Sequence, residues 1–180
     1  MADSIKVMIS EERVNRRINE LAEQISEDFK GRSVHLVCIL KGSIFFTCEL
    51  AKRLSVPVTI DFMSVSSYGA GTKSSGVVRL VKDLDEPLEG KDVIVIEDII
   101  DSGRTLSYLM ENLSARKPAT LKLCTLLDKP DRRVTDVYVD YTGFEIPDEF
   151  VVGYGLDYDQ KYRNLPYIGV LIPSSDSSET

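Results

Sequence analysis

Apolar residues recur at helical spacing in three stretches of this chain. The first stretch follows Ser10, a possible N-cap with two acidic neighbours, and its apolar residues lie three or four positions apart: Val14, Ile18, Leu21, Ile25 and Phe29. A second helix is expected over 44–54. The third stretch has the i, i+3, i+4, i+7 pattern of an amphipathic helix: Leu106, Leu109, Met110 and Leu113. Gly31 and Pro118 predict where the first and third helices end.

Short apolar runs lie before, between and after these helices. They predict strands over 34–40, 56–65, 77–81, 92–97, 121–127, 134–141 and 167–172. The run inside 92–97 is apolar without interruption, which is typical of a parallel strand covered on both faces. Because strands alternate with helices, the pattern predicts an α/β fold with a mostly parallel twisted sheet flanked by helices. Ligands of such sheets bind beyond the carboxyl ends of the strands.

Two further stretches have almost nothing to bury. Residues 66–76 are rich in Gly and Ser and are expected to form a flexible loop, whereas 174–180 are expected to be a disordered tail. A chain of 180 residues is long enough to bury a core and too short for two full domains, so we expect one domain over 1–180.

The charge balance narrows the possible functions. Acidic residues outnumber basic ones by 29 to 22, and the net charge of −7 disfavours nucleic acid or an anionic membrane as the main partner. The start of the chain lacks the pattern of a signal peptide, and no apolar run approaches the roughly 18 residues of a membrane span, so a cytoplasmic location is expected. The cysteines lack CxxC spacing and are expected to be buried, reduced thiols: Cys38, Cys48 and Cys124. Since His35 is the only histidine, catalytic triads and histidine metal clusters are excluded.

The most informative segment is VIVIEDIIDSGRT at 93–105, where a buried strand runs into acidic residues. Glu97 and Asp98 would repel each other by roughly 2 kcal/mol at about 8 Å and an effective dielectric constant near 20, so a cation or a hydroxyl-rich ligand is expected. The residues after them offer hydroxyls, a flexible glycine and free amides where a helix begins: Asp101, Ser102, Gly103, Arg104 and Thr105. Carboxylates followed by phosphate donors suggest a ribose 5-phosphate. The alternative is a turn that only caps the helix.

This segment resembles the phosphoribosyl pyrophosphate signature of the type I phosphoribosyltransferases. Four further segments are similar to the bacterial hypoxanthine-guanine members of that family: LKGS at 40–43, SSYG at 66–69, LLDKP at 126–130 and GFEIPDEFVVGYGLDYDQKYRN at 143–164. The resemblance implies a small hood formed by the terminal segments, and Mg²⁺ as the cofactor. Ser102 and Arg104 stand where relatives often have Thr and Lys, and both differences keep a hydroxyl or a cation.

The resemblance assigns the pyrophosphate to two loops. Lys41 and Gly42 would form a pyrophosphate loop with an unusual peptide bond between them that could be cis, and an ordinary strand-to-helix turn is the alternative. Ser67 and Tyr68 would fold over the pyrophosphate when substrate is bound and would exclude water. Composition alone would make residues 66–76 a plain linker.

Lys129 is the candidate for reading the base. It follows a strand end, so its ammonium can project into the crevice and donate to the 6-oxo group of hypoxanthine or guanine. Adenine has an amino donor there, and two opposed donors leave a group unsatisfied at about 1–3 kcal/mol, which favours oxopurines roughly tenfold to a hundredfold. The alternative is a solvated surface lysine.

The segment 143–164 would complete the site. By resemblance, Phe150 stacks on the base, the backbone of Val151 reads the purine edge, and Arg163 contacts pyrophosphate. Phe150 could equally be a core aromatic residue. Three scattered carboxylates would share a Mg²⁺ ion with water and substrate phosphates: Glu97, Asp98 and Asp157.

The resemblance therefore implies a purine-salvage enzyme. Hypoxanthine, with guanine as a second base, would displace pyrophosphate from phosphoribosyl pyrophosphate to give IMP or GMP. Asp101 would face ring nitrogen 7 of the purine, acting either as a base or through its charge. A homodimer or homotetramer is typical of the family. Two alternatives stay open: a regulatory protein that keeps the fold as a sensor and binds nucleic acid, and a transferase that prefers xanthine or another base.

Overall fold

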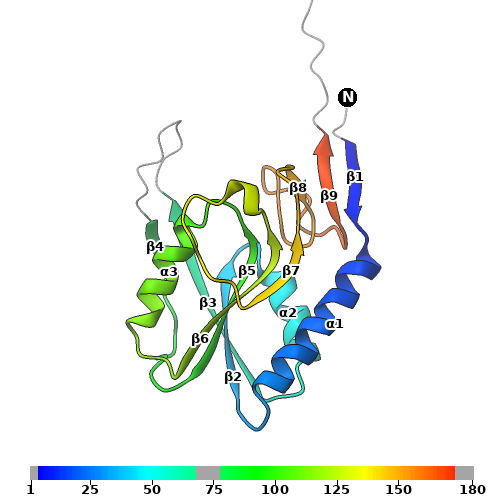
Figure 1. The fold of residues 1–180 in the computed structure, drawn as a ribbon. Helices are drawn as coiled ribbons and strands as arrows, with labels where there is room; N and C mark the ends of the chain where they lie inside the picture. The colour runs from blue at the N-terminus through cyan, green and yellow to red at the C-terminus, as the bar shows by residue number, and fades with distance from the viewer. Residues whose placement is uncertain (1–3, 68–77, 173–180) are drawn as a thin grey trace, which may run out of the picture.

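A six-stranded sheet forms the centre of the protein in this computed structural model, which describes residues 4–67 and 78–172 (Figure 1). The strand order is β4-β3-β2-β5-β6-β7, with these bounds: β2 Val34–Leu40, β3 Val58–Ser67, β4 Val78–Lys82, β5 Asp92–Ile100, β6 Thr120–Asp128 and β7 Tyr141–Glu145. Only the β3–β4 pair of this sheet is antiparallel. The expected α/β fold with a mostly parallel sheet is confirmed.

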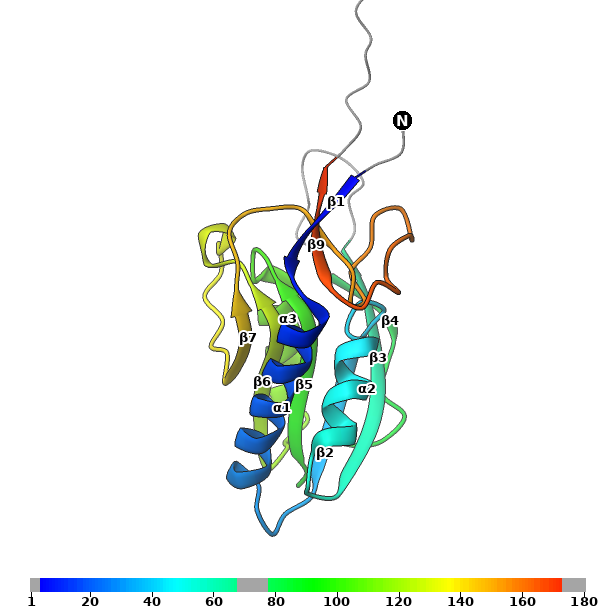
Figure 2. The same cartoon turned by 90° about the vertical axis from the view of Figure 1, so that its right-hand side faces the viewer.

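Helices cover both faces of this sheet (Figure 2). The helices α1 (Glu11–Asp28) and α2 (Ile44–Arg53) lie on one face, and α3 (Arg104–Ser114) lies on the other. Alternate residues of β5 enter different clusters: Ile94 and Ile96 pack with α1 and α2, whereas Val93 and Val95 pack with α3. The uninterrupted apolar run thus belongs to a strand buried on both faces.

A second, three-stranded antiparallel sheet forms the hood, in the order β1-β9-β8. Its strands are β1 (Ser4–Ile9), β8 (Val151–Val152) and β9 (Ile168–Ile172). The first and last described strands pair directly, and the hood lies at the end of the molecule where the central parallel strands finish (Figure 1). The expectation of a hood made by terminal segments is confirmed, although β1 itself was not among the expected strands.

The expected strand over 134–141 is wrong, because β7 begins only at Tyr141 and residues 134–140 are irregular. Val134 and Tyr138 are 64 % and 81 % exposed, while Val137 and Val139 pack on the α3 side of the core. The backbone amide of Val134 donates to the carbonyl of Ser102 at 3.0 Å. The apolar residues of this segment alternate because one side of the segment packs on the α3 side of the core, although the segment pairs with no described strand.

Three boundaries or burial states also differ from the expectation. Strand β5 continues to Ile100, so Glu97 and Asp98 lie within it, because it pairs with β6 as far as Asp128. Strand β3 continues through Ser67, which pairs with Val78, whereas Tyr68, the rest of the expected loop 66–76 and the tail 174–180 lie outside the described residues.

Cys38 and Cys124 are buried as expected, but Cys48 is exposed because it lies on the outer side of α2. No described helix is both long and apolar enough to span a membrane.

Candidate functional site

Gly42 and Asp98 meet at the carboxyl edge of β2 and β5. A Cβ atom on Gly42 would lie 1.5 Å from Oδ2 of Asp98, so only glycine fits. Gly155 approaches from the hood, where its own Cβ would lie 1.8 Å from the carbonyl oxygen of Gly42. The cis peptide bond of this loop joins Leu40 to Lys41, one bond before the Lys41–Gly42 bond that the sequence suggested. The loop is thus packed between a carboxylate and the hood.

Glu97 and Asp98 form a desolvated acidic pair beside this loop. Oε1 of Glu97 accepts hydrogen bonds from Ser43 Oγ and from the amide of Asp98, both at 3.1 Å. Burial raises the pKa of Glu97 well above its usual value, and the adjacent carboxylate of Asp98 raises it further. Burial also raises the pKa of Asp98, although hydrogen bonds from Glu97 and from the amide of Ile99 oppose this shift. Two half-buried acids that resist ionisation together favour a nearby cation.

Arg163 brings a positive charge to the same edge from the hood. Its Nη1 donates to the carbonyl of Gly155 at 2.7 Å, and its Nη2 lies 2.9 Å from Oδ1 of Asp157. Oε1 of Gln160 accepts from both Arg163 Nη2 and Lys41 Nζ, at 3.3 Å each. Gln160 therefore joins Lys41, in the loop after β2, to Arg163 of the hood.

The three expected metal carboxylates are not assembled into one protein cage. Among residues 4–67 and 78–172, no three His, Cys, Asp or Glu side chains come together closely enough to hold a metal ion. Asp157 is instead engaged by Arg163 and by the backbone amide of Gln160 at 2.8 Å. This arrangement fits Mg²⁺, which keeps several waters and shares substrate oxygens, better than it fits a structural metal.

The turn from β5 into α3 is held in shape by Gly103. This residue has a φ of +81° at the N-cap of α3, and a Cβ there would lie 2.4 Å from the carbonyl oxygen of Thr135. The carbonyl of Ser102 accepts hydrogen bonds from the amides of Val134 and Thr135, both at 3.0 Å. The amide of Arg104 donates to Ser102 Oγ at 3.5 Å, whereas the amides of Thr105 and Leu106 have no partner within the helix, and a helix start of this kind suits an anion.

Lys129 is not in the solvent-exposed environment of a surface lysine, and Phe150 is not in the buried environment of a core aromatic residue. Lys129 is only 8 % exposed, and its Nζ lies 3.7 Å from Oδ1 of Asp148, so it is no solvated surface lysine. Phe150 is 54 % exposed and packs edge-on against Tyr158, with 5.8 Å between the ring centroids, so it is no core aromatic residue. Val151 is buried, and its backbone pairs with Val170 of β9.

Asp101 extends from the end of β5 and is half exposed. Its Oδ1 accepts a hydrogen bond from Arg132 Nε at 3.0 Å. Of the expected lid residues, only the backbone of Ser67 is described, and it lies at the end of β3. The site residues thus converge from the ends of β2, β5 and β6 and from the hood.

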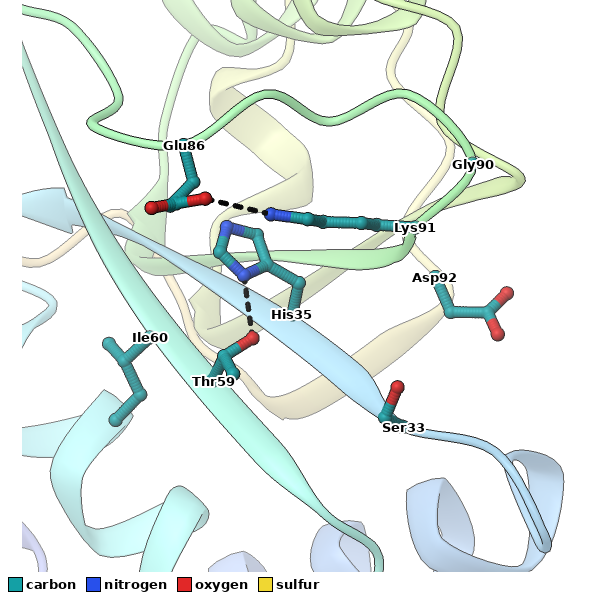
Figure 3. Close-up of a pocket in the computed structure, with 8 residues that line it drawn as sticks. All are labelled: Ser33, His35, Thr59, Ile60, Glu86, Gly90, Lys91 and Asp92. Carbon is teal, nitrogen blue, oxygen red and sulfur yellow. Dashed lines mark hydrogen bonds and ion pairs between the residues drawn. The ribbon is translucent and has the colours of Figure 1, made fainter.

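A separate pocket of about 460 Å³ lies at the opposite, amino-terminal ends of β2, β3 and β5 (Figure 3). His35 lines it, with Nδ1 2.7 Å from Thr59 Oγ1, beside an ion pair between Glu86 and Lys91 at 3.8 Å. Burial, and next the charge of Lys91, lower the pKa of His35, so the imidazole is neutral at neutral pH. This pocket shares no residue with the acidic edge of Gly42, Glu97 and Asp98.

Comparison with known proteins agrees with this geometry, since a model of the phosphoribosyl transferase domain matches residues 9–159. The chain belongs to the phosphoribosyltransferase family. It is 51 % identical to a hypoxanthine-guanine phosphoribosyltransferase of Streptococcus thermophilus over 94 % of each chain. It is 49 % identical to one of Mycobacterium tuberculosis, over 95 % of this chain and 88 % of the relative. A crystal structure of the Bacillus anthracis hypoxanthine-guanine phosphoribosyltransferase is similar with a TM-score of 0.90 and 50 % identity, over 94 % of this chain and all of that one.

Four polar residues at the site were not singled out from the sequence: Ser43, Arg132, Asp148 and Gln160. Three of them lie within segments that carry the family resemblance. Each of these three contacts another site residue: Ser43 contacts Glu97, Asp148 contacts Lys129, and Gln160 contacts Lys41. Arg132 lies two residues after such a segment and pairs with Asp101 across 31 positions. Their roles depend on contacts between distant segments, which spacing along the chain does not reveal.

Proposed function

We propose that this protein transfers the 5-phosphoribosyl group from phosphoribosyl pyrophosphate to hypoxanthine and guanine, giving IMP or GMP and pyrophosphate. The observation that carries the proposal is the carboxylate of Asp98 packed on Gly42, with the amide-lined start of α3 directly after the same strand. Acceptors for ribose hydroxyls thereby lie between two groups of anion donors. Relatives named for this activity are about half identical over nearly the whole chain, which supports the proposal.

In this proposal the donor substrate spans the acidic edge. Glu97 and Asp98 accept hydrogen bonds from the ribose hydroxyls, and the turn of residues 101–105 donates to the 5-phosphate. Lys41 and Arg163, which meet at Gln160, face the pyrophosphate. Positive groups fixed where negative charge develops on the leaving group stabilise the transition state.

Mg²⁺ suits the two adjacent, half-buried carboxylates Glu97 and Asp98. Glu97 and Asp98 would hold the ion partly through water, with Asp157 as a further contact from the hood, because no protein cage exists around any of them in the described residues. When bound, Mg²⁺ supplies positive charge that favours departure of pyrophosphate.

The purine would lie between Lys129, Phe150 and Asp101. Phe150 is exposed enough to stack on a base, and the backbone of Val151 would read the purine edge. Lys129 donates to the 6-oxo group, and Asp101 accepts the proton from ring nitrogen 7. These roles explain why a lysine is almost fully enclosed while the neighbouring aromatic ring is exposed.

A direct assay tests the activity. The full chain is incubated with Mg²⁺, phosphoribosyl pyrophosphate and one base at a time, and pyrophosphate release is followed. We expect release with hypoxanthine and guanine and little with adenine. Release mainly with xanthine would favour the other transferase alternative. Binding of phosphoribosyl pyrophosphate without release for any base would favour a regulatory sensor and refute the proposal.

Substitution of Lys129 tests the base assignment. Lys129→Met keeps the length of the side chain and removes its donors, so kcat/KM for hypoxanthine should fall roughly tenfold to a hundredfold, and the preference over adenine should shrink by a similar factor. Lys161→Met is the matched control, because Lys161 is exposed on the hood. An unchanged preference for hypoxanthine would remove Lys129 from base recognition.

Three further expectations from the sequence stay predictions. They are that residues 1–180 form one domain, that the protein is cytoplasmic, and that it assembles as a homodimer or homotetramer. A sedimentation experiment on the full chain would decide the last of these.

A further inference from the structure

Four charged side chains form a continuous bridge along the base side of the site. Arg132 Nε donates to Asp101 Oδ1 at 3.0 Å, and Arg132 Nη1 lies 3.7 Å from Asp148 Oδ2. The other oxygen of Asp148, Oδ1, lies 3.7 Å from Lys129 Nζ. The order Asp101, Arg132, Asp148, Lys129 alternates in charge, and its two ends are the residues proposed to contact the purine.

Backbone hydrogen bonds hold the three segments that carry this bridge. The amide of Lys129 donates to the carbonyl of Ile100 at 3.0 Å, which places Lys129 beside the start of the Asp101 turn. The amide of Arg132 donates back to the carbonyl of Lys129 at 3.1 Å, in the short 3₁₀ helix η1 (Pro130–Arg132). The amide of Ile146 donates to the carbonyl of Asp128 at 2.8 Å, which holds the loop of Asp148 next to the same strand end. The side chains thus meet on a fixed frame.

The neighbouring arginine is used differently. Arg133 is largely buried and pairs with Asp128 at the end of β6, so it belongs to the frame. Arg132 is half exposed and reaches Asp101 and Asp148, which are half exposed as well. Exposed ion pairs contribute little to the free energy of unfolding, so stability alone does not account for the two ion pairs of Arg132.

We propose that Arg132 and Asp148 are positioning residues that set the spacing between Asp101 and Lys129, and so match both to one edge of the purine. The proposal rests on the function proposed above. Nitrogen 7 and the 6-oxo group are neighbours on the same edge of hypoxanthine and guanine. Because Arg132 occupies Oδ1 of Asp101, Oδ2 is left to accept the proton from nitrogen 7. Asp148 pairs with Lys129 Nζ at 3.7 Å, beyond hydrogen-bond distance, so this ion pair leaves the N–H groups of Lys129 for the 6-oxo oxygen.

Steady-state kinetics of the full chain test this role. Arg132→Gln should lower kcat with hypoxanthine about tenfold and leave the KM for phosphoribosyl pyrophosphate within twofold, because the substitution disturbs the base side only. Arg132→Lys should recover only part of the loss, since one ammonium cannot bond both carboxylates as the guanidinium fork does. Arg16→Gln is the matched control, because it also removes an exposed arginine paired with a carboxylate at 3.0 Å, far from the site.

A double-mutant cycle separates positioning from a general loss of structure. In an Asp101→Asn background, Arg132→Gln should change kcat less than twofold, because the group on which Arg132 acts has lost its charge. In the same way, Asp148→Asn should raise the KM for hypoxanthine threefold to tenfold in the wild type and less than twofold in a Lys129→Met background. The bridge is refuted if Arg132→Gln keeps wild-type kcat, or if its effect is undiminished in the Asp101→Asn background.

A measurement without substrate keeps this inference apart from the proposed activity. Scalar couplings in the free protein report the χ1 rotamer of Asp101, which should be single in the wild type and in Arg16→Gln and averaged in Arg132→Gln. If the wild type were inactive with every base, the proposed function would be refuted, but the Asp101 rotamer would still show whether Arg132 positions Asp101. An Asp101 rotamer that is the same in all three proteins would overturn the positioning role.

Discussion

Gly42 lies where three parts of the site touch one another. Its Cα hydrogen faces the carboxylate of Asp98, its carbonyl oxygen faces Gly155 of the hood, and Lys41 before it reaches Gln160. No other residue type fits here without moving Asp98 or the loop. Glycine is needed at position 42 because a Cβ atom would collide with Asp98. Its backbone conformation is not the reason, since Gly42, unlike Gly103, has no positive φ.

Gly42→Ala should therefore damage activity more than Gly31→Ala, where a Cβ meets nothing. The new methyl group would displace the Asp98 carboxylate, so we expect kcat/KM for phosphoribosyl pyrophosphate to fall at least tenfold, with a loss of about 1–3 kcal/mol in the free energy of unfolding. Gly31→Ala is the control: Gly31 has a φ of +76° but nothing near its Cβ position, so it should lose about 1 kcal/mol of stability and no activity. Wild-type kinetics for Gly42→Ala would contradict this account.

The residues that the sequence could identify are those in contiguous runs. Glu97, Asp98 and the turn after them were visible because one strand carries them all, and an acidic strand end next to a helix start has a direct chemical meaning. Arg132 and Asp148 were not visible, because each acts through a side chain from another segment. The exposure of Cys48 was missed for a related reason: apolar neighbours along a short helix do not reveal which side faces the core.

At the scale of elements, strongly periodic segments were predicted well and weakly periodic ones were not. Helix α1 begins after Ser10, whose Oγ accepts from the amide of Arg13 at 3.4 Å, and buries the whole expected stripe. The segment 134–140 shows the limit of periodicity, because alternation also arises where an unpaired segment packs one side on a helix face. Strand β1 was missed because Lys6 interrupts its apolar residues and only Ile9 of the strand is buried.

The element β7 is tied to α1 through a polar cluster. The hydroxyl of Tyr141 donates to Asp28 Oδ2 at 2.6 Å, and Lys122 Nζ donates to the same hydroxyl at 2.9 Å. The hydrogen bond from Tyr141 lowers the pKa of Asp28, and Lys122 adds to this effect against the opposing influence of burial. The carboxylate form of Asp28 thus favours the folded state.

Tyr141→Phe should make the stability less dependent on pH. A depressed carboxyl pKa contributes stability that is complete above the unfolded value near 3.9 and is lost as the pH falls through the folded value. We expect the variant to lose about 1 kcal/mol at pH 7 and progressively less below about pH 4, measured by urea unfolding between pH 3 and 7. Tyr138→Phe, at an exposed tyrosine, should show no change. A constant difference between wild type and Tyr141→Phe at all pH values would rule out the linkage.

At the scale of the whole molecule, the site lies between the six-stranded central sheet and the smaller three-stranded sheet of the hood. The central sheet has strands buried on both faces, whereas the hood is a small antiparallel sheet with exposed apolar residues at Val7 and Ile172. The residues proposed to bind the donor come mainly from the central sheet, and those proposed to bind the base come from both. Family resemblance predicted this division, which no pattern within the chain would have indicated, because β1 and β9 are far apart in sequence.

This difference predicts unequal protection against amide hydrogen exchange. Amides of β1 and β9 should exchange at least tenfold faster than those of β2 and β5, because short exposed elements open without unfolding the central core. Hydrogen exchange of the free protein, followed by NMR or mass spectrometry, measures both sets in one experiment. Equal protection in the two sheets would mean that they unfold as one cooperative unit.

The pairing of Ser4 with Ile172 also has a consequence for biosynthesis. A ribosome releases β1 early, yet its hydrogen-bonding partner emerges only after more than 160 further residues. The phosphate turn and the parallel strands around it can be complete on the nascent chain while the first strand is still single. Closure of the hood should therefore be the last assembly step, and the proposed purine subsite should mature after the proposed sugar-phosphate subsite.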